Sequence, residues 1–162
     1  MKIRPIELRD AAAVLAIHNA AIEDGLGNLD HRIRNIAEQQ AWVDAHLGSH
    51  PALVAEDDAG TVIAYAAISP YNDRTGYTPT VENSIYVDAT AQGRGVGRAL
   101  LDALVELAAD CGFHSMIARI TSTNEPSIRL HAAAGFELVG VEREVARKRG
   151  QWFDVTIMQR ML

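Results

Sequence analysis

Gln92-Gly-Arg-Gly-Val-Gly-Arg98 is the stretch that decides the fold of this chain. It follows a strand-like run over residues 80–88 and leads directly into a strongly amphipathic segment that begins at Val96. A glycine-rich turn between a strand and a helix is typical of an anion site, because the first N–H groups of a helix lack partners and carry partial positive charge. Glycines let the backbone approach a ligand, and Arg94 and Arg98 add full charges, which suits a pyrophosphate.

Glycine-rich turns also occur in two well-known nucleotide-binding loops and in turns that bind nothing. A Walker loop ends in Gly-Lys-Ser/Thr, whereas this turn continues Gly97-Arg98-Ala99. A Rossmann loop has Gly-x-Gly-x-x-Gly after the first strand of a βαβ unit, whereas Gly93-x-Gly95-x-Gly97 has a different spacing and follows the fourth predicted strand. On glycine spacing alone, a turn that binds no ligand stays open as well.

Outward from the turn, hydrophobic periodicity predicts strands and helices along the whole chain. Strands are predicted at residues 2–6, 51–56, 61–69, 80–88, 114–121, 136–145 and 152–162. Helices are predicted at about 11–23, 36–47, 96–111 and 125–134. This order predicts an α+β (mixed α/β) fold in which a mostly antiparallel sheet of six to seven strands is flanked by about four helices. We find no linker or repeat, so residues 1–162 are expected to form a single domain.

Local sequence features support several of these elements. Asp10 stands where it can cap the first helix, and Asn35 with Glu38 resembles a capping box at the start of the second. The second helix is predicted to bury one apolar face, made of Ile36, Val43 and Leu47. The third helix is predicted to carry an apolar stripe, made of Val96, Leu100, Leu104, Leu107 and Cys111.

The composition limits the classes of function. The net charge of -6 at pH 7 makes the chain a poor general binder of nucleic acid or anionic membranes. The basic run of Arg143 and residues 147–149 is interpreted as a solvated hairpin end. With the single cysteine Cys111, no signal-like segment and no membrane span, the expected location is the cytoplasm. No metal is expected: His46 and His50 are four residues apart, but Gly48 is expected to end the helix between them, so they would not form a pair of metal ligands.

The glycine turn and its flanks resemble a known superfamily. Gln92, Arg94, Gly95 and Gly97 fit Gln/Arg-x-x-Gly-x-Gly/Ala, the acetyl-CoA signature of the GNAT acetyltransferases. The preceding Ser84-Ile-Tyr-Val-Asp88 and the later Asn124-x-x-Ser127-x-x-Leu130-His131-x-x-x-Gly135-Phe136 agree with it. The resemblance implies the GNAT fold and acetyl-CoA as cosubstrate.

Further segments are similar to one branch of that superfamily, the phosphinothricin / methionine sulfoximine acetyltransferases. They are Asn19-Ala-Ala-x-Glu23-Asp24, Ala41-Trp42, Thr80-Val-Glu82-x-Ser84-x-Tyr86-Val87 and Lys148-x-Gly150-x-Trp152-x-Asp154. This resemblance runs essentially from end to end of the chain. It implies a small-molecule amine as acceptor and, because the branch is usually dimeric, a homodimer.

The resemblance also assigns the residues that hold the cofactor. The backbone of Ile85, Tyr86 and Val87 is expected to pair with the pantetheine arm like an added strand. The pyrophosphate is expected in the turn made of Gln92, Gly93, Arg94, Gly95, Val96, Gly97 and Arg98. Asn124 and Ser127 are expected to contact the cofactor further along the arm.

Glu82 is the candidate general base. Along its strand, Thr80, Glu82, Ser84 and Tyr86 share one face by alternation, and a carboxylate is unusual among β-branched and aromatic neighbours. On alternation alone, an exposed or salt-bridged Glu82 stays open, and the resemblance favours the base. His131 stands where many GNAT enzymes place a tyrosine, so it is a candidate proton donor to the leaving thiolate, with a packed structural histidine as the alternative.

The acceptor side departs from the branch at two places. In residues 70–79, Arg74 and Tyr77 match the branch, but Asn72 stands where a first arginine is usual. Residues 25–29 read Gly-Leu-Gly-Asn-Leu, with Leu29 at its end, where the branch usually has Thr and Phe near the acceptor pocket. These changes, beside an intact cofactor side, indicate a retained reaction and a shifted acceptor.

The sequence therefore predicts an acetyl-CoA-dependent N-acetyltransferase (acyltransferase) that works by direct attack in a ternary complex. The first hypothesis is a small amino-acid-like acceptor, of the methionine sulfoximine, methionine sulfone or phosphinothricin type. The second keeps the enzyme and changes the acceptor to a protein or peptide N-terminus, a lysine or another amine. The third is an acyl-CoA-binding sensor without turnover, which an intact Glu82 disfavours.

Overall fold

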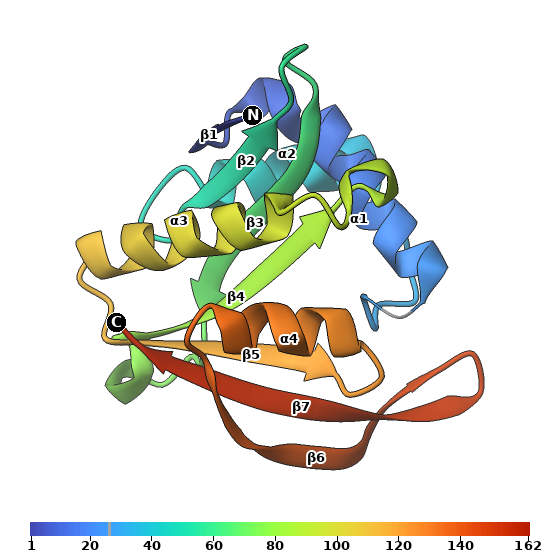
Figure 1. Ribbon diagram of the computed structural model, residues 1–162, viewed down its shortest axis with the longest axis vertical. Coiled ribbons are helices and arrows are strands. Elements are labelled where there is room, and N and C mark those ends of the chain that lie inside the picture. Colours follow the sequence, from blue (N-terminus) through green and yellow to red (C-terminus); the bar gives the residue numbers. More distant parts are fainter. Residues whose placement is uncertain (26) are drawn as a thin grey trace.

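The computed structural model describes residues 1–25 and 27–162, and the strands of these residues form one seven-stranded sheet. Across the sheet the strands follow the order β1-β2-β3-β4-β5-β7-β6 (Figure 1). Their bounds are β1 Lys2–Pro5, β2 Ala52–Glu56, β3 Val62–Pro70, β4 Thr80–Val87, β5 Ser115–Thr121, β6 Glu137–Lys148 and β7 Gln151–Met161. Every neighbouring pair is antiparallel except β4 and β5, which run parallel. The predicted sheet is confirmed.

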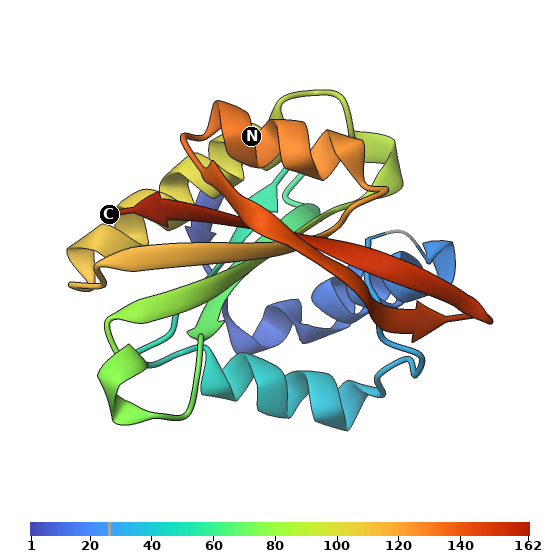
Figure 2. The same ribbon diagram turned by 90° about the horizontal axis from the view of Figure 1, so that it is seen from below.

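Four α-helices within the described ranges cover the two faces of the sheet. They are α1 Ala11–Asp24, α2 Ile36–Ala45, α3 Val96–Asp110 and α4 Glu125–Ala133. Helices α1 and α2 lie on one face and α3 and α4 on the other, as the view from below shows (Figure 2). Short 3-10 turns at Leu8–Asp10, Thr75–Tyr77 and Ala89–Ala91 precede α1, β4 and α3. None of the described helices is long and apolar enough to cross a membrane.

The sheet separates two hydrophobic cores. Because side chains alternate along a strand, neighbouring residues of β2 enter different cores. Leu53 packs with the fully buried Leu100 and Leu104 under α3, whereas Val54 packs with Val14 under α1. Burying one such side chain contributes about 2 kcal/mol. The two cores therefore fix which face each side chain of the central strands occupies.

Strands β4 and β5 pair only at their beginnings. The register joins Thr80 to Ser115, Val81 to Met116 and Glu82 to Ile117, and ends there. Beyond these pairs the strands spread apart (Figure 1). Residues 83–87 of β4 are therefore left without a neighbouring strand on that side, and the sheet opens next to Glu82.

The predicted apolar face of α2 is wrong at two of its three positions. Val43 is fully buried, but Ile36 and Leu47 are 45% and 55% exposed. The helix ends at Ala45, so Leu47 lies outside it, and the side that faces the core carries Gln39 and Val43. Because the buried residue Gln39 is polar, the hydrophobic pattern of the sequence does not indicate which side of α2 faces the core.

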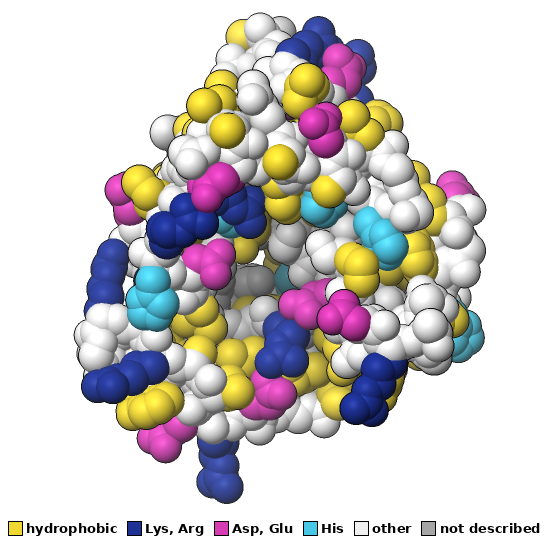
Figure 3. Space-filling view, turned by 180° about the vertical axis from the view of Figure 1, so that it is seen from behind, with side chains coloured by type: hydrophobic (Ala, Val, Ile, Leu, Met, Phe, Trp, Pro, Cys, Tyr) yellow, Lys and Arg dark blue, Asp and Glu magenta, His cyan; other side chains and the backbone are white. Residues whose placement is uncertain are grey.

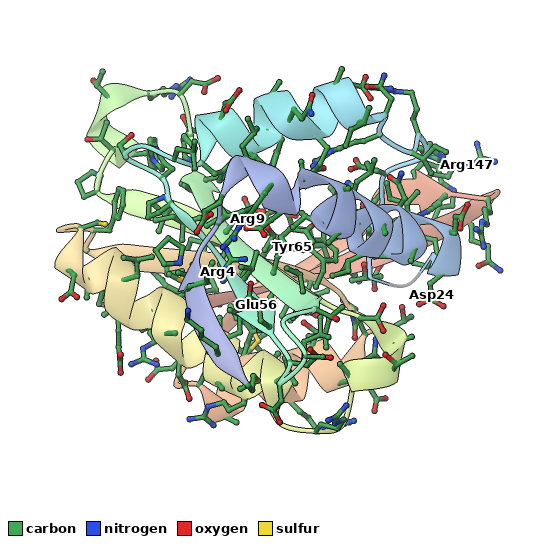
Figure 4. All side chains as sticks on the ribbon, turned by 90° about the horizontal axis from the view of Figure 1, so that it is seen from above. Arg4, Arg9, Asp24, Glu56, Tyr65 and Arg147 are labelled. Atoms are coloured by element: carbon green, nitrogen blue, oxygen red, sulfur yellow. The ribbon has the colours of Figure 1, made fainter. Side chains whose placement is uncertain are left out.

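Two further local expectations need correction. Asp10 stands before α1 but does not cap it, because its carboxylate accepts hydrogen bonds from Arg4 at 2.7 and 2.8 Å and from the Glu7 N–H at 2.8 Å. Arg4 also pairs with Glu56, and these two side chains point toward each other in Figure 4. Cys111 is exposed, since α3 ends at Asp110 and the apolar stripe ends with it.

Candidate active site

The glycine turn before α3 presents free backbone N–H groups. Gly93 and Gly95 have φ values of 70° and 81°, a region that favours glycine. The N–H of Ala99 donates to the Gly95 carbonyl at 3.1 Å, so the N–H groups of residues 96–98 have no partner within the helix. A Cβ built at Gly93 or Gly95 meets no atom within 4 Å, so the space beside both is open. The turn has the donors and the room that a pyrophosphate needs.

The other residues of the turn have different environments. Arg94 and Arg98 are both exposed; Arg94 precedes the helix, and Arg98 lies in its first turn and pairs with Asp102 at 2.6 Å. Gln92 donates from Nε2 to the carbonyl of Val87 at 3.2 Å, which ties the turn to the end of β4. A Cβ at Gly97 would lie 3.4 Å from the Val87 side chain. Gly97 therefore serves the close packing of α3 on β4, whereas Gly93 and Gly95 border open space.

The open side of β4 offers backbone hydrogen-bonding groups. The Asp88 N–H donates to the Ile63 carbonyl of the neighbouring segment at 2.9 Å. Because peptide groups alternate along an antiparallel ladder, those of Tyr86 also face β3, and those of Ile85 and Val87 face the opening. Of the three residues predicted to pair with pantetheine, Ile85 thus presents its N–H and carbonyl to the opening, and Val87 presents its N–H, because its carbonyl accepts the hydrogen bond from Gln92. Tyr86 contributes its side chain on the α1 face instead.

Asn124 and Ser127 lie at the other wall of the opening, where β5 leads into α4. Asn124 caps α4, because its Oδ1 accepts a hydrogen bond from the Ser127 N–H at 3.2 Å. Both side chains are half-buried. The predicted cofactor residues therefore surround the opening, with the glycine turn and β4 on one side and the start of α4 on the other.

Glu82 lies at the last pair before β4 and β5 separate, opposite Ile117. Its side chain is half-buried. Burial raises the pKa of the Glu82 carboxyl above its ordinary value, the charge of Arg119 opposes this shift, and that of Glu142 reinforces it. A carboxylate with a raised pKa beside an opening in the sheet has the properties of a general base.

His131 lies on the opposite face of β4 from Glu82. It is 2% exposed, its Nδ1 lies 2.8 Å from the Ser127 carbonyl, and its Nε2 lies 3.1 Å from Asn83 Oδ1. Burial lowers the pKa of His131, with a smaller opposite effect from the Ser127 carbonyl. A neutral ring has one N–H, and the Ser127 carbonyl and Asn83 Oδ1 can both only accept, so a neutral His131 donates to one of the two. Proton donation from Nε2 therefore requires the form of the ring that carries a proton on this nitrogen.

The loop after α1 lies against Tyr86. Asn28 is buried and donates from Nδ2 to the Tyr86 hydroxyl at 3.2 Å, and Leu29 beside it is half-buried. Asn28 Oδ1 also accepts the N–H of Asp30 at 2.8 Å, which shapes the loop. Leu26 lies outside the described residues. The loop that departs from the branch in sequence is thus in contact with the strand that carries Glu82.

The tip of the β6–β7 hairpin holds this loop in place. Lys148 is 4% exposed and donates from Nζ to the carbonyls of Ile22 and Asn28 at 2.7 and 2.6 Å. Arg149 donates to the Glu23 carbonyl at 2.5 Å, and Figure 4 shows Asp24 and Arg147 at the same end of the molecule. The interpretation of this basic run as a solvated hairpin end is therefore wrong for Lys148. Its role was hidden because its partners are more than a hundred residues away.

A buried polar cluster under β4 also escaped the sequence analysis. His18 Nδ1 lies 2.7 Å from the Tyr65 hydroxyl, and the rings of Tyr65 and Tyr86 stack with centroids 5.1 Å apart. Burial lowers the pKa of His18 to about 4, helped by the charge of Arg34 and opposed by Asp30. Burial raises the pKa of Tyr86 to about 12. These side chains support the β4 face on which Glu82 lies.

The loop of residues 70–79 lies at the start of β4, at the other end of the strand from the glycine turn (Figure 1). Asn72, Arg74 and Tyr77 are all exposed. Asn72 Oδ1 accepts the Arg74 N–H at 3.0 Å, and the ring of Tyr77 lies 5.7 Å from that of Tyr71. The structure thus places these predicted acceptor residues at the surface, in contacts that stay within their own loop.

The molecule is hollowed on the face seen from behind. Figure 3 shows the hollow in the middle of that face, where Figure 1 shows β4 and β5 apart, with acidic, basic and histidine side chains around it. A separate cavity of about 660 Å³ lies between the end of α4 and the outer strands, and Arg98 is the predicted site residue among those that line it. In the described ranges, no three metal-ligating side chains gather into one group.

Comparisons with known proteins agree with this geometry. A family model described as an acetyltransferase (GNAT) domain matches residues 3–157. An L-methionine sulfoximine/L-methionine sulfone acetyltransferase of Pseudomonas paraeruginosa is 40% identical over 97% of this chain and 92% of its own length.

Two solved structures extend the agreement to three dimensions. A ribosomal-protein-alanine N-acetyltransferase from Brucella melitensis has a TM-score of 0.97 and 36% identity, and the match covers 100% of both chains. A phosphinothricin acetyltransferase from Sinorhizobium meliloti, solved with acetyl-CoA, has a TM-score of 0.95 and 36% identity over 99% of this chain and 88% of that one. The predicted fold and family are confirmed. The chain belongs to the GNAT acetyltransferase family.

Proposed function

We propose that this protein transfers the acetyl group of acetyl-CoA to the primary amine of a small amino-acid-like acceptor. The observation that carries the proposal is the position of Glu82, a half-buried carboxyl with a raised pKa at the last β4–β5 pair. A base at this point faces an opening whose other end carries the glycine turn. A thioester held along the open strand edge then has its acetyl group beside the base.

The residues of the opening fit acetyl-CoA. The N–H groups of the turn and the charges of Arg94 and Arg98 would hold the pyrophosphate. The peptide groups of Ile85 and the N–H of Val87 would pair with the amides of pantetheine, as a strand edge does with an added strand. Asn124 and Ser127 would contact the arm from the opposite wall.

The reaction joins the acceptor nitrogen to the acetyl carbon and breaks the carbon–sulfur bond. Glu82 accepts the proton that the amine loses, directly or through a water. A base in this position typically contributes about 10²–10⁴ in rate. The oxyanion that develops on the acetyl carbonyl would accept a hydrogen bond from a free N–H of residues 85–87, among which Ile85 and Val87 face the opening.

His131 is our candidate for the group that protonates the leaving thiolate. It is buried beside Ser127 and Asn83, on the α4 wall of the opening. The reactive atom would be Nε2, and Asn83 would have to give up its contact with it. A His131→Gln variant that keeps its acetyl-CoA affinity and loses turnover would support the donor role, whereas an unchanged rate would leave His131 as a packed structural residue.

For the acceptor we propose the amino-acid-like class first. The P. paraeruginosa relative is named for L-methionine sulfoximine and L-methionine sulfone, and its match covers nearly the whole chain. The specific observation that favours a second class is the likeness to a ribosomal-protein-alanine N-acetyltransferase, which supports a peptide N-terminus as alternative acceptor.

The test is the release of free thiol from acetyl-CoA in the presence of a panel of amines. Release with methionine sulfone, methionine sulfoximine or phosphinothricin supports the first class, and release with peptides alone supports the second. Calorimetric binding of acetyl-CoA without thiol release for any amine would instead indicate a sensor without turnover. No binding heat would remove the proposal altogether.

We also propose that the protein works as a homodimer in the cytoplasm. Large apolar side chains are exposed along the outer hairpin, namely Leu138, Val139, Val141, Val145 and Trp152. Exposed apolar surface of this extent is typical of a protein–protein contact. Sedimentation equilibrium at micromolar concentration should give twice the 17.6 kDa chain mass, and a monomer mass would reject the dimer.

A further inference from the structure

Arg119 of β5 lies on the same face of the sheet as Glu82 of β4. Glu82 is paired with Ile117 of β5, and Arg119 is two residues further along that strand. Side chains two apart in a strand share a face and stand about 7 Å apart. The pairing of β4 with β5 ends at Ile117, and the side chain of Arg119 extends over the neighbouring β7 to Glu142 of β6.

The Arg119 guanidinium is available to a ligand. The neighbouring Ala118 and Ile120 are 1% and 6% exposed, whereas the side chain of Arg119 is 36% exposed. Its Nη2 pairs with Glu142 Oε2 of β6 at 2.5 Å, and the Glu142 side chain is 41% exposed. Ion pairs with this exposure contribute little stability, so a ligand carboxylate can take the place of Glu142. A guanidinium also has five donors, more than this one contact uses.

The charges of Arg119 and Glu142 affect the pKa of Glu82. The positive charge of Arg119 lowers this pKa, and the negative charge of Glu142 raises it. At position 72, by contrast, the chain has an uncharged asparagine whose Oδ1 is engaged in a turn with the Arg74 N–H. A cation that could meet an acceptor carboxylate close to the base is therefore present at Arg119.

We propose that Arg119 binds the carboxylate of the acceptor in place of Glu142, and so selects free α-amino acids and their analogues over peptides. In an α-amino acid the amine and the carboxylate are attached to the same carbon. An amine directed at Glu82 then leaves the carboxylate on the side of Arg119, where a guanidinium can bind it with two parallel hydrogen bonds. A peptide N-terminus has an uncharged amide at that place. This inference rests on the proposed function.

The test compares methionine sulfone with methionine sulfone amide, which lacks the negative charge. The wild-type protein should prefer the acid about tenfold to a hundredfold in KM, the range expected for hydrogen bonds to a charged group. Arg119→Gln should bring that ratio close to one, without a change in acetyl-CoA affinity. Arg119→Lys should keep part of the preference for the acid, because lysine keeps the positive charge but cannot form the two parallel hydrogen bonds of a guanidinium. Arg9→Gln, which removes an exposed ion pair with Glu7 at the turn before α1, is the matched control.

Glu142→Gln separates recognition from a structural role. If Glu142 competes with the substrate, its removal should lower the KM for methionine sulfone, whereas Arg119→Gln raises it. A structural ion pair would make both variants change in the same direction, and that result would overturn the inference. An acid-to-amide ratio that Arg119→Gln leaves unchanged would overturn it too.

Binding of methionine sulfone and its amide, measured by calorimetry with CoA present, gives the same ratio without turnover. If the wild-type protein binds the acid in preference to the amide but releases no thiol, the proposed reaction fails and the recognition by Arg119 stands. If it turns over both equally well, the reaction stands and the inference about Arg119 fails.

Discussion

The two halves of the candidate site are built in different ways. The cofactor half, defined as the glycine turn of residues 92–98 with residues 83–87 of β4, offers mainly backbone groups. The acceptor half, defined as Glu82, residues 27–34 after α1 and the hairpin tip of residues 147–150, is assembled from side chains of distant segments. A backbone site needs glycine and a helix start, which a short motif encodes. A side-chain site can change its ligand through a few substitutions.

The largest effect is expected from Glu82→Gln, which should impair the chemistry of the acceptor half and leave cofactor binding by the cofactor half unchanged. Loss of the base should lower kcat by about 10²–10⁴ and leave the Kd of acetyl-CoA unchanged. Because burial raises the pKa of Glu82, the wild-type kcat/KM should increase with pH through a value above 4.5, and this limb should vanish in the variant. Steady-state kinetics between pH 4 and 9 checks both points. Glu106→Gln on the exposed side of α3 is the control.

An unaltered rate in Glu82→Gln would remove this residue from the base role. If Glu82→Gln lowers both the rate and the affinity for acetyl-CoA, the cofactor half and the acceptor half do not function independently, and the distinction between them is wrong.

The next effect concerns the support of the acceptor half. The pKa of His18 is lowered from 6.5 to about 4, so the unfolded chain takes up a proton in acid that the folded protein refuses. This contribution to stability is fully present above pH 6.5 and is lost as the pH falls toward 4, by about 3 kcal/mol in total. Urea unfolding of the wild type and His18→Gln at pH 4, 5.5 and 7 measures it. The wild type should lose more stability than the variant, and equal losses would contradict the prediction.

A smaller effect is expected from Lys148→Met. The substitution keeps the length of the side chain and leaves the carbonyls of Ile22 and Asn28 without their donor. Two unsatisfied carbonyls should cost about 2 kcal/mol of unfolding free energy. The KM for the amine should rise, because the loop against Tyr86 loosens, whereas acetyl-CoA binding should stay the same. Arg143→Met, an exposed position on the same strand, should change neither quantity, and an equal loss in both variants would argue against the anchor.

The fold could be predicted because its elements are encoded locally. Alternation over residues 80–88 and the glycines that follow predict a strand, a turn and a helix, and the structure has β4 and α3 there. The prediction fails where burial depends on tertiary context. Leu47 fits a helical pattern that stops two residues earlier, and Gln39 is polar yet faces the core.

The site could be predicted in part for the same reason. Alternation places Glu82 and Asn83 on opposite faces of β4, but the end of the β4–β5 pairing at Glu82 depends on the direction of two strands and leaves no local signal. Lys148 and Arg119 were missed because their roles depend on partners from other elements, Lys148 on the loop after α1 and Arg119 on Glu142 of β6.

The smallest effect is expected at the glycine turn, where Gly95→Ala tests the backbone half. Gly95 has φ of 81°, and an alanine held there costs about 1–2 kcal/mol. Gly60, in the turn between β2 and β3, has the same φ of 81° and also has nothing within 4 Å of a built Cβ. Gly60→Ala therefore imposes the same backbone strain away from the site, and both variants should lose similar stability in urea.

The two glycine variants should differ only in binding. In Gly95→Ala the methyl group enters the space beside the free N–H groups, so the Kd of acetyl-CoA should rise about tenfold, the value of one hydrogen bond to a charged group. Gly60→Ala should leave the Kd unchanged. If both variants bind equally well, the space beside Gly95 is not where the pyrophosphate lies. The part of the cofactor half that stays supported would then be the open edge of β4.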